Sequence, residues 1–300
     1  TLLLGYLRKP TLWTLLATIV FFTFLTLYSA VTGKVTDCGC FGDALKLTPW
    51  QSFYKDVALL VLILVLLAGS KYINPIGSRL FRAGATALAL VACILFANYV
   101  LNHLPWIDFR PYHIGASIPE GMVIPEDAPA PVYEYDWKFR IDGEEQIITT
   151  NGEYPEVEGE FVEVADTREI RAGYEPPIHD FTLEREGVDY AGEILTRPQL
   201  LMVISYDLDK SHAPAFKALA RYTDSAAALG YSVIGMSASS QEAVDALKAA
   251  NKLDFPFYFS DQTTLKTIVR SNPGVLRLER GIIRQKLHYT DLEELELQPL

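Results

Sequence analysis

The stretch TLWTLLATIVFFTFLTLYSAV, residues 11–31, decides the class of this protein. Its 21 residues carry no charged side chain, and an α-helix needs about 20 mostly apolar residues to cross the hydrocarbon core of a bilayer. Residues 83–102 are nearly as apolar. The apolar run 57–70 is short enough for a buried helix, but the aromatic residues before it extend it to 53–70. We expect three membrane spans, at about 11–31, 53–70 and 83–102.

Basic residues in the short loops predict the orientation of these spans. Arg8 and Lys9 precede the first span, and Lys71, Arg79 and Arg82 lie between the second and the third, with no acidic residue in either place. Lys and Arg near span ends are retained in the cytoplasm. By alternation, the loop 32–52 and everything after residue 103 should lie outside. The predicted location is the cytoplasmic (inner) membrane, multi-pass, with a periplasmic C-terminal half.

The charge balance divides the chain into a membrane unit and an exported half. Residues 1–104 contain 8 basic and 3 acidic residues, net +5, whereas residues 105–300 contain 18 and 34, net −16. A strongly acidic exported half argues against binding of nucleic acid or of anionic lipid headgroups. The expected partners are therefore the lipid bilayer and exported or envelope proteins. The chain starts without methionine on an apolar segment, so we expect that N-terminal spans are missing.

The exported half contains two different patterns. Residues 105–176 form an acidic, proline-rich juxtamembrane segment in which residues 133–141 alternate apolar and polar, as a half-buried strand does. The pair Asp142-Gly143 favours a hairpin turn. Residues 177–300 alternate strands and helices instead, which predicts an α/β domain, with Ser239 and Glu242 as a capping box for its second helix. We therefore expect domains at 1–104, 105–176 and 177–300.

Two segments of the last domain resemble a known family. The stretch PIHDFTL, residues 177–183, resembles the entry to the TlpA and peroxiredoxin-like branch of thioredoxin folds, and SNPG, residues 271–274, resembles the segment that carries the cis-proline of that branch. The resemblance implies a thioredoxin-like domain in which Pro273 follows a cis peptide bond. Pro214 resembles the proline that follows the Cys-x-x-Cys pair of redox-active members.

This domain differs from redox-active members of the family because it lacks the two cysteines of their active site. The redox positions fall within Tyr206 to Asp209, and residues 177–300 contain no cysteine. The thiolate is the nucleophile in disulfide exchange, so the domain cannot perform exchange by itself. We expect a docking role, with Asp207, Asp209 and Pro273 as candidate docking residues. The alternatives are a polar ligand held at this loop and a simple solvated loop.

The membrane half resembles a second family. The stretch DCGCFGD, residues 37–43, is followed by TPW at 48–50 and Lys55-Asp56 before the next span. It resembles the periplasmic loop of the MauE/DoxX membrane family, a four-helix membrane unit linked to envelope redox maturation. The resemblance covers about the first hundred residues, and the fusion to a thioredoxin-like domain resembles DoxX-family proteins of Bacteroidetes type.

Cys38 and Cys40 are the candidate reactive residues. A thiol pair on the oxidising side of the membrane is expected to be oxidised or active in exchange. Gly39 permits the tight bend, and strained exposed disulfides tend to be the labile ones. Phe41, Gly42 and Asp43 complete the motif. The pair would pass electrons between an exported partner and an acceptor in the membrane, for which a quinone is the candidate.

Other roles for these cysteines stay open. Each could be bridged elsewhere in the chain, or both could be reduced and packed on Phe41, because spacing does not fix connectivity. A metal is not expected, since two sulfurs without nearby histidine leave a tetrahedral zinc site incomplete. Cys93 lies within a predicted span, where we expect it to pack as a small apolar side chain. Asp37, Asp43 and Asp56 could hold protons during exchange or be interfacial charges only.

Two functions therefore compete at this point. The first is a thiol-disulfide redox helper for envelope protein maturation, with a redox-inactive docking domain. The second is a non-enzymatic anchoring or assembly subunit of an envelope membrane complex. The sequence leaves open whether the chain is an enzyme.

Overall fold

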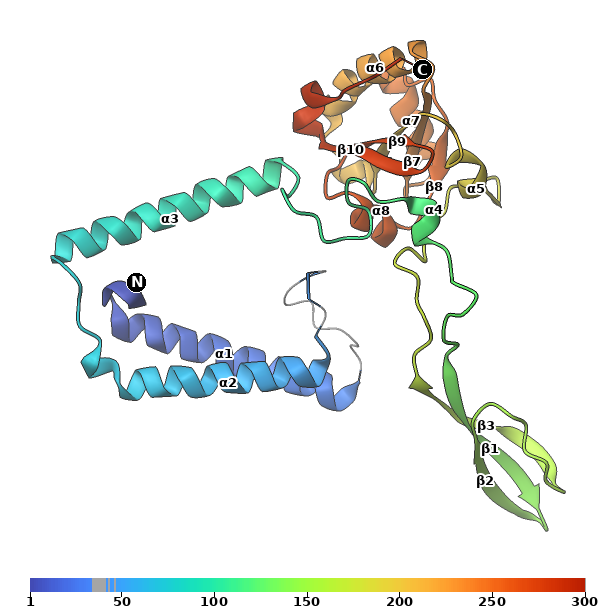
Figure 1. The fold of residues 1–300 in the computed structure, drawn as a ribbon, viewed down its shortest axis with the longest axis horizontal. Helices are drawn as coiled ribbons and strands as arrows, with labels where there is room; N and C mark the ends of the chain where they lie inside the picture. The colour runs from blue at the N-terminus through green and yellow to red at the C-terminus, as the bar shows by residue number, and fades with distance from the viewer. Residues whose placement is uncertain (34–41, 43, 46, 300) are drawn as a thin grey trace. The chain divides into compact units, whose positions relative to one another are not determined.

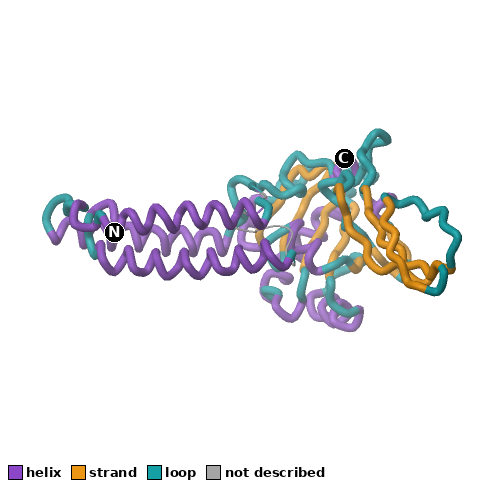
Figure 2. The backbone as a smooth tube through the Cα atoms, turned by 90° about the horizontal axis from the view of Figure 1, so that it is seen from below, coloured by secondary structure: helices purple, strands orange, loops and turns teal. Residues whose placement is uncertain are grey.

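The computed structural model describes residues 1–33, 42, 44, 45 and 47–299. The chain divides into two compact units, Thr1–Arg110 and Pro111–Leu300. Figure 2 shows that long helices make up the first unit, whereas the strands belong to the second.

The first unit has a long apolar helix at each of the three predicted spans. The helices α1, α2 and α3 are each long and apolar enough to cross a membrane. Their bounds, with those of two short 3-10 turns, are η1 (Leu2–Leu4), α1 (Arg8–Thr32), α2 (Pro49–Ala68), η3 (Ser70–Tyr72) and α3 (Arg79–Asn102) (Figure 1).

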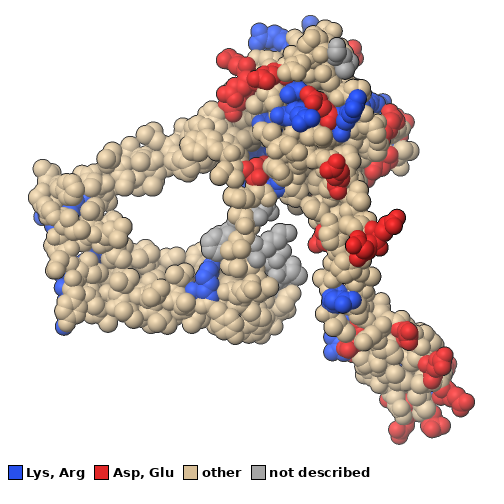
Figure 3. All heavy atoms as spheres, viewed as in Figure 1, with Lys and Arg blue, Asp and Glu red and all other residues tan. Residues whose placement is uncertain are grey.

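The second and third helices begin four residues before the predicted starts of their spans, because capping residues rather than charge set the first turn. Thr48 and Gln51 form a capping box at the start of α2, and Ser78 accepts a hydrogen bond from the Phe81 N–H at the start of α3. Such caps satisfy backbone N–H groups that lack an intrahelical partner. Charged side chains are sparse on the helices in the face that Figure 3 shows, and acidic side chains gather on the second unit.

A small antiparallel sheet in the second unit confirms the predicted hairpin. Its strands are β1 (Val132–Ile141), β2 (Glu144–Thr150) and β3 (Glu160–Arg171), in the order β2-β1-β3. Asp142 and Gly143 both have positive φ, 52° and 84°, as the two-residue turn of a type I′ hairpin requires. Phe139 is 1% exposed and packs against the rings of Tyr154 and Phe161.

The remainder of this unit is a seven-stranded α/β sheet in the order β10-β9-β6-β7-β8-β4-β5. Strands β6, β7 and β8 are parallel, and β9 and β10 are antiparallel to their neighbours. The strands are β4 (Glu184–Arg185), β5 (Val188–Asp189), β6 (Leu200–Ser205), β7 (Ser232–Ser237), β8 (Phe257–Phe259), β9 (Gly274–Glu279) and β10 (Ile282–His288). The helices are α4 (Ile118–Gly121), α5 (Ala191–Ile194), η4 (Leu208–Lys210), α6 (Ala213–Ala228), α7 (Gln241–Asn251), α8 (Gln262–Ile268) and η5 (Tyr289–Glu294).

The core lies on both faces of this sheet. Leu201 and Val203 of β6 pack with Phe216 and Leu219 of α6 on one face. The alternate residues of β6 point to the opposite face, because successive side chains of a strand alternate, and all six residues of β6 are fully buried. The peptide bond Asn272–Pro273 is cis, which confirms the prediction made for Pro273. Strand order, helix order and this cis-proline give a thioredoxin-like fold.

Two details differ from the expectations. Ser240, not Ser239, caps α7 by accepting from the Ala243 N–H, because the Ser239 hydroxyl instead accepts from the Leu208 N–H. The expected juxtamembrane segment 105–176 also divides, since residues 115–118 pair with β10. The Gly115 N–H donates to the Ile283 carbonyl, and the Ile118 N–H donates to the Gly281 carbonyl. These bonds cover the edge of the sheet.

Candidate functional site

The thioredoxin-like domain places the segment after β6 against the residue that precedes the cis-proline. Ser205, the last residue of β6, is fully buried, and its hydroxyl donates to the Asn272 side-chain oxygen over 2.7 Å. The Asn272 amide nitrogen donates to the Asp207 carbonyl over 2.7 Å. The His212 N–H then donates to the Asn272 carbonyl over 2.9 Å. Asn272 therefore holds both ends of the loop in which the family resemblance predicts the sulfur pair, the first end through its side chain and the second through its backbone carbonyl.

The carboxylates predicted in this loop have different surroundings. Asp207 accepts from the Lys210 N–H and makes a 2.8 Å ion pair with the Lys210 ammonium. The side-chain hydrogen bond from the Lys210 ammonium lowers the pKa of Asp207. Asp209 is exposed. Asp207 therefore closes its own turn, and Asp209 is the carboxylate that remains accessible to a partner.

Pro273 is buried, so the exposed surface of this region belongs to its neighbours. The imidazole ring of His212 at the start of α6 stacks on the Tyr289 ring, with centroids 4.6 Å apart and an angle of 8° between the planes. His212 is exposed. The structure thus brings Asp207, His212 and Pro273 together around Asn272.

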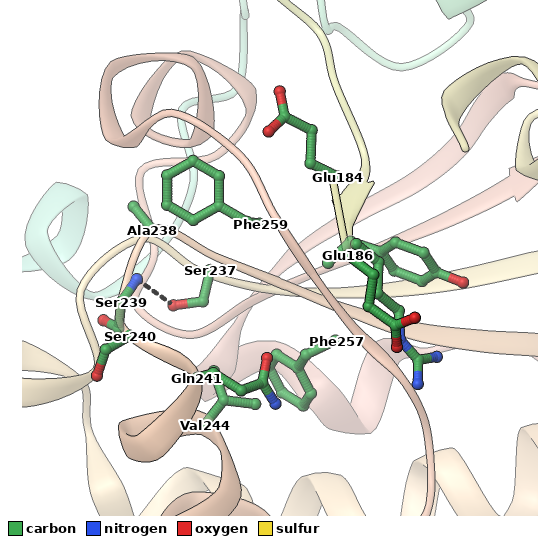
Figure 4. A pocket seen from close by; sticks show the side chains of 12 residues that line it. Glu184, Glu186, Ser237, Ala238, Ser239, Ser240, Gln241, Val244, Phe257 and Phe259 are labelled. Atoms are coloured by element: carbon green, nitrogen blue, oxygen red, sulfur yellow. Dashed lines mark hydrogen bonds and ion pairs between the residues drawn. The ribbon is translucent and has the colours of Figure 1, made fainter. Parts of the chain in front are cut away.

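A hollow of about 720 Å³ adjoins the same loop. It is lined by the β7–α7 connection, by Phe257 and Phe259 of β8, and by Glu184 and Glu186 near β4 (Figure 4). Ser239 lines the hollow and binds the Leu208 N–H over 3.0 Å. The hollow and the loop after β6 are therefore joined through one serine side chain.

The cysteine motif of the membrane unit lies largely outside the described residues. Cys38, Gly39, Cys40, Phe41 and Asp43 belong to the undescribed part, and their predicted roles stay predictions. Gly42 has φ +55°, a left-handed conformation that glycine adopts without strain. Cys93 is a free, exposed thiol on α3.

A polar pair joins α1 and α2, and only one of its two residues was singled out from the sequence. Asp56 is 3% exposed, and its Oδ2 accepts from the Thr26 hydroxyl over 3.1 Å. The Lys55 ammonium lies 3.2 Å from Asp56 Oδ1. The sequence marks Asp56 as a charge near the start of a span, but it does not show that Thr26 faces it.

Sequence reasoning also missed Ser205 and Asn272, and it assigned Ser239 to a helix cap instead of to this loop. The available signal was the position of Asn272 directly before a predicted cis-proline. Its amide contacts a carbonyl 65 residues earlier in the chain, which no local pattern reveals.

Comparison with known families supports the membrane unit. Residues 1–69 match the model of the family described as methylamine utilisation protein MauE. The match includes α1, α2 and their connection. No curated protein matches the chain. The chain therefore joins a MauE-like membrane unit to a thioredoxin-like domain.

Solved structures align with the C-terminal domain at low identity. A hypothetical protein from Sinorhizobium meliloti 1021 aligns at 18% identity and a TM-score of 0.28, over 35% of this chain and 63% of that chain, so less than two-thirds of that chain is spanned. The thioredoxin domain of a thiol-disulfide oxidoreductase from Bacteroides vulgatus aligns at 13% identity and a TM-score of 0.30, over 38% and 89%. StoA from Bacillus subtilis aligns at 16% identity and a TM-score of 0.29, over 38% and 93%.

Proposed function

We propose that this protein is a membrane-anchored thiol-disulfide helper. Cys38 and Cys40 carry the exchange chemistry, and the thioredoxin-like domain docks an exported client without redox chemistry of its own. The observation that supports the docking role is the Asn272 network, whose hydrogen bonds to Ser205 and Asp207 order the loop where the resemblance predicts the sulfur pair. The three cysteines of the sequence are residues 38, 40 and 93, so none lies in that domain.

The exchange step conserves atoms and electrons. A client dithiol attacks the Cys38–Cys40 disulfide, two S–H bonds and one S–S bond break, and the client leaves with a new S–S bond while Cys38 and Cys40 become thiols. A quinone-class acceptor in the membrane then takes the two electrons and two protons and restores the disulfide. The position of the pair between α1 and α2, within the residues matched to MauE, supports this placement.

The docking role uses the exposed residues near Pro273. Asp209 and His212 are exposed in the loop after β6, and the adjoining hollow offers the exposed Phe259 ring, with two acidic residues, Glu184 and Glu186, and one basic residue, Arg185, in its lining. A client segment with apolar side chains and basic flanks fits these groups. The proposal places this surface outside the cytoplasmic membrane, as the basic loops predict.

The test compares two serine variants in cells. Cys38→Ser is expected to shift envelope proteins with cysteine pairs towards their reduced forms, as measured by alkylation and gel mobility. Cys93→Ser is the matched control, because it removes an exposed thiol of α3, and it should leave the pattern unchanged. An unchanged pattern in Cys38→Ser would overturn the redox proposal.

A second candidate is an anchoring subunit without chemistry. The observation that favours it is the same hydrogen-bonded network in place of sulfur, because a docking domain alone needs no thiol. In that case a variant with Cys38 and Cys40 both replaced by serine would retain its partners in a pull-down and would support growth as the wild type does. Loss of function with retained partners would favour the redox helper instead.

A further inference from the structure

Asp56 is a carboxylate inside a membrane-spanning helix. It lies seven positions after Pro49, the first residue of α2, which is about 10 Å along the axis at 1.5 Å per residue. Its partner Thr26 lies six positions before the end of α1, about 9 Å from that end. The pair therefore sits about two turns inside both helices, at the ends that the connection 33–48 joins.

A third polar group completes this cluster. Ser52 precedes Asp56 by four positions, so both side chains lie on one face of α2, and Ser52 is fully buried. Its hydroxyl has no hydrogen-bond partner among the residues that the structure describes. Charged groups within spans are costly and usually mark a pathway for ions or protons. The hydroxyl of Ser52 can both accept and donate a proton.

The Thr26 hydroxyl can form a hydrogen bond with Asp56 in both protonation states of the carboxyl group. Its hydroxyl lies 3.1 Å from Asp56 Oδ2 and 3.0 Å from the Phe22 carbonyl of its own helix. When Asp56 is a carboxylate, the Thr26 hydroxyl donates to it. When Asp56 is a carboxylic acid, it donates to Thr26, whose hydrogen turns to the Phe22 carbonyl. Both states are satisfied without movement of a heavy atom.

We propose that Asp56, with Thr26 and Ser52, is the proton-transfer site of the redox reaction. The inference rests on the proposed function. When Cys38 and Cys40 are oxidised, two S–H bonds break, one S–S bond forms, and two electrons and two protons pass to a quinone-class acceptor as two O–H bonds form. Asp56 takes a proton released by the thiols and gives it to the quinone oxygen, and it returns to its starting state after each transfer.

The surrounding charges fit a proton better than a metal ion. Lys55, 3.2 Å away with 30% of its side chain exposed, balances the charge of the carboxylate. The charged residues of α1, Arg8 and Lys9, lie at its other end. Among the residues that the structure describes, one carboxylate and two hydroxyls lie here, fewer than the six or more oxygens that a hard cation such as calcium takes.

The test uses the full chain in lipid vesicles with a soluble dithiol peptide as donor and an alkyl benzoquinone as acceptor. Quinone reduction is followed by its ultraviolet absorbance. Asp56→Asn should lower the initial rate about 100-fold, within the range of a positioned proton-transfer group, and Asp56→Glu should restore part of it. Thr26→Val should lower the rate about threefold to tenfold, as expected for loss of one hydrogen bond. Thr18→Val, an exposed threonine of the same helix, is the matched control and should have no effect.

The outcomes separate the two proposals. If Cys38→Ser is inactive and Asp56→Asn turns over at the wild-type rate, the proton site is wrong and the redox function stands. If Cys38→Ser is as active as wild type, the redox function itself fails. Infrared difference spectra of the redox change provide a second measurement should Asp56→Asn not fold. A carboxyl band that Thr26→Val shifts and Thr18→Val does not supports the site, and the absence of such a band in the wild type overturns it.

Discussion

The side-chain amide of Asn272 donates to the backbone carbonyl of Asp207 over 2.7 Å, which ties the residue before the cis-proline to the loop after β6. The other end of the same amide accepts from Ser205. Asn272 is 8% exposed and Ser205 is fully buried. A thioredoxin-like domain without cysteines thus keeps an ordered loop through amide and hydroxyl groups.

Asn272→Ala should destabilise the C-terminal unit by about 3 kcal/mol. The change leaves the buried Ser205 hydroxyl and the Asp207 carbonyl without their partner, and each unsatisfied buried group costs about 1–3 kcal/mol. Urea unfolding of residues 111–300 measures the effect. Asn151→Ala, at an exposed turn, should change stability by less than about 0.5 kcal/mol. A loss below about 1 kcal/mol for Asn272→Ala would contradict the network's role.

Tyr112→Phe should be neutral or stabilise the domain by up to about 1 kcal/mol. Tyr112 is 1% exposed, and its hydroxyl has no hydrogen-bond partner in the described part of the chain, so removing the hydroxyl removes an unsatisfied polar group. Burial, and then the charge of Asp180, raises the pKa of Tyr112. Tyr112→Ala should cost about 3–5 kcal/mol, because it opens a cavity of aromatic size. A clear destabilisation by Tyr112→Phe would show that the hydroxyl is bonded in solution.

Glu279→Gln should reduce the loss of stability of the domain in acid. The hydrogen bond from Arg277 lowers the pKa of Glu279, and Arg284 lowers it further. A carboxyl whose pKa is lower in the folded state stabilises the fold above its unfolded pKa, and that contribution is lost as the pH falls through the folded pKa. The free energy of unfolding in urea should therefore fall more between pH 7 and pH 3 for the wild type than for the variant, by less than about 1 kcal/mol for a partly exposed pair. If the wild type and the variant lose the same stability between pH 7 and pH 3, the pKa of Glu279 does not contribute to the acid sensitivity of the fold.

Gly235→Ala should cost about 2 kcal/mol, the range of an overpacked core. A Cβ at Gly235 would lie 2.5 Å from the Phe257 ring. Phe257→Leu in the same chain should recover part of the loss, so a double-mutant cycle in urea should show coupling between the two sites. Gly192→Ala is the control, since nothing lies within 4 Å of its Cβ position. If Gly235→Ala lowers the free energy of unfolding equally in the wild type and in the Phe257→Leu variant, the contact is disproved.

The elements that local chemistry determines could be predicted from the sequence. The three long helices of the first unit could be predicted from the length of the apolar runs, and the turn at Asp142-Gly143 from the positive φ that such residues tolerate. The cis peptide at Pro273 followed from a family resemblance. Each depends on a few neighbouring residues.

The features that sequence reasoning missed depend on contacts between distant segments. Ser240 replaced Ser239 as the cap of α7 because the Ser239 hydroxyl binds Leu208 in another loop. Residues 115–118 pair with β10 because its edge was free for backbone hydrogen bonds. The Thr26–Asp56 pair depends on how α1 rotates against α2, which apolar composition does not determine.

Labelling of intact cells tests the placement of the reactive sulfur most directly. The Cys93→Ser protein is treated with a membrane-impermeant maleimide before and after mild reduction, and adducts at Cys38 and Cys40 are located by mass spectrometry. The account predicts no adduct before reduction and adducts on both residues after it. Adducts that form only after the cells are lysed would place the pair on the cytoplasmic face and contradict the account.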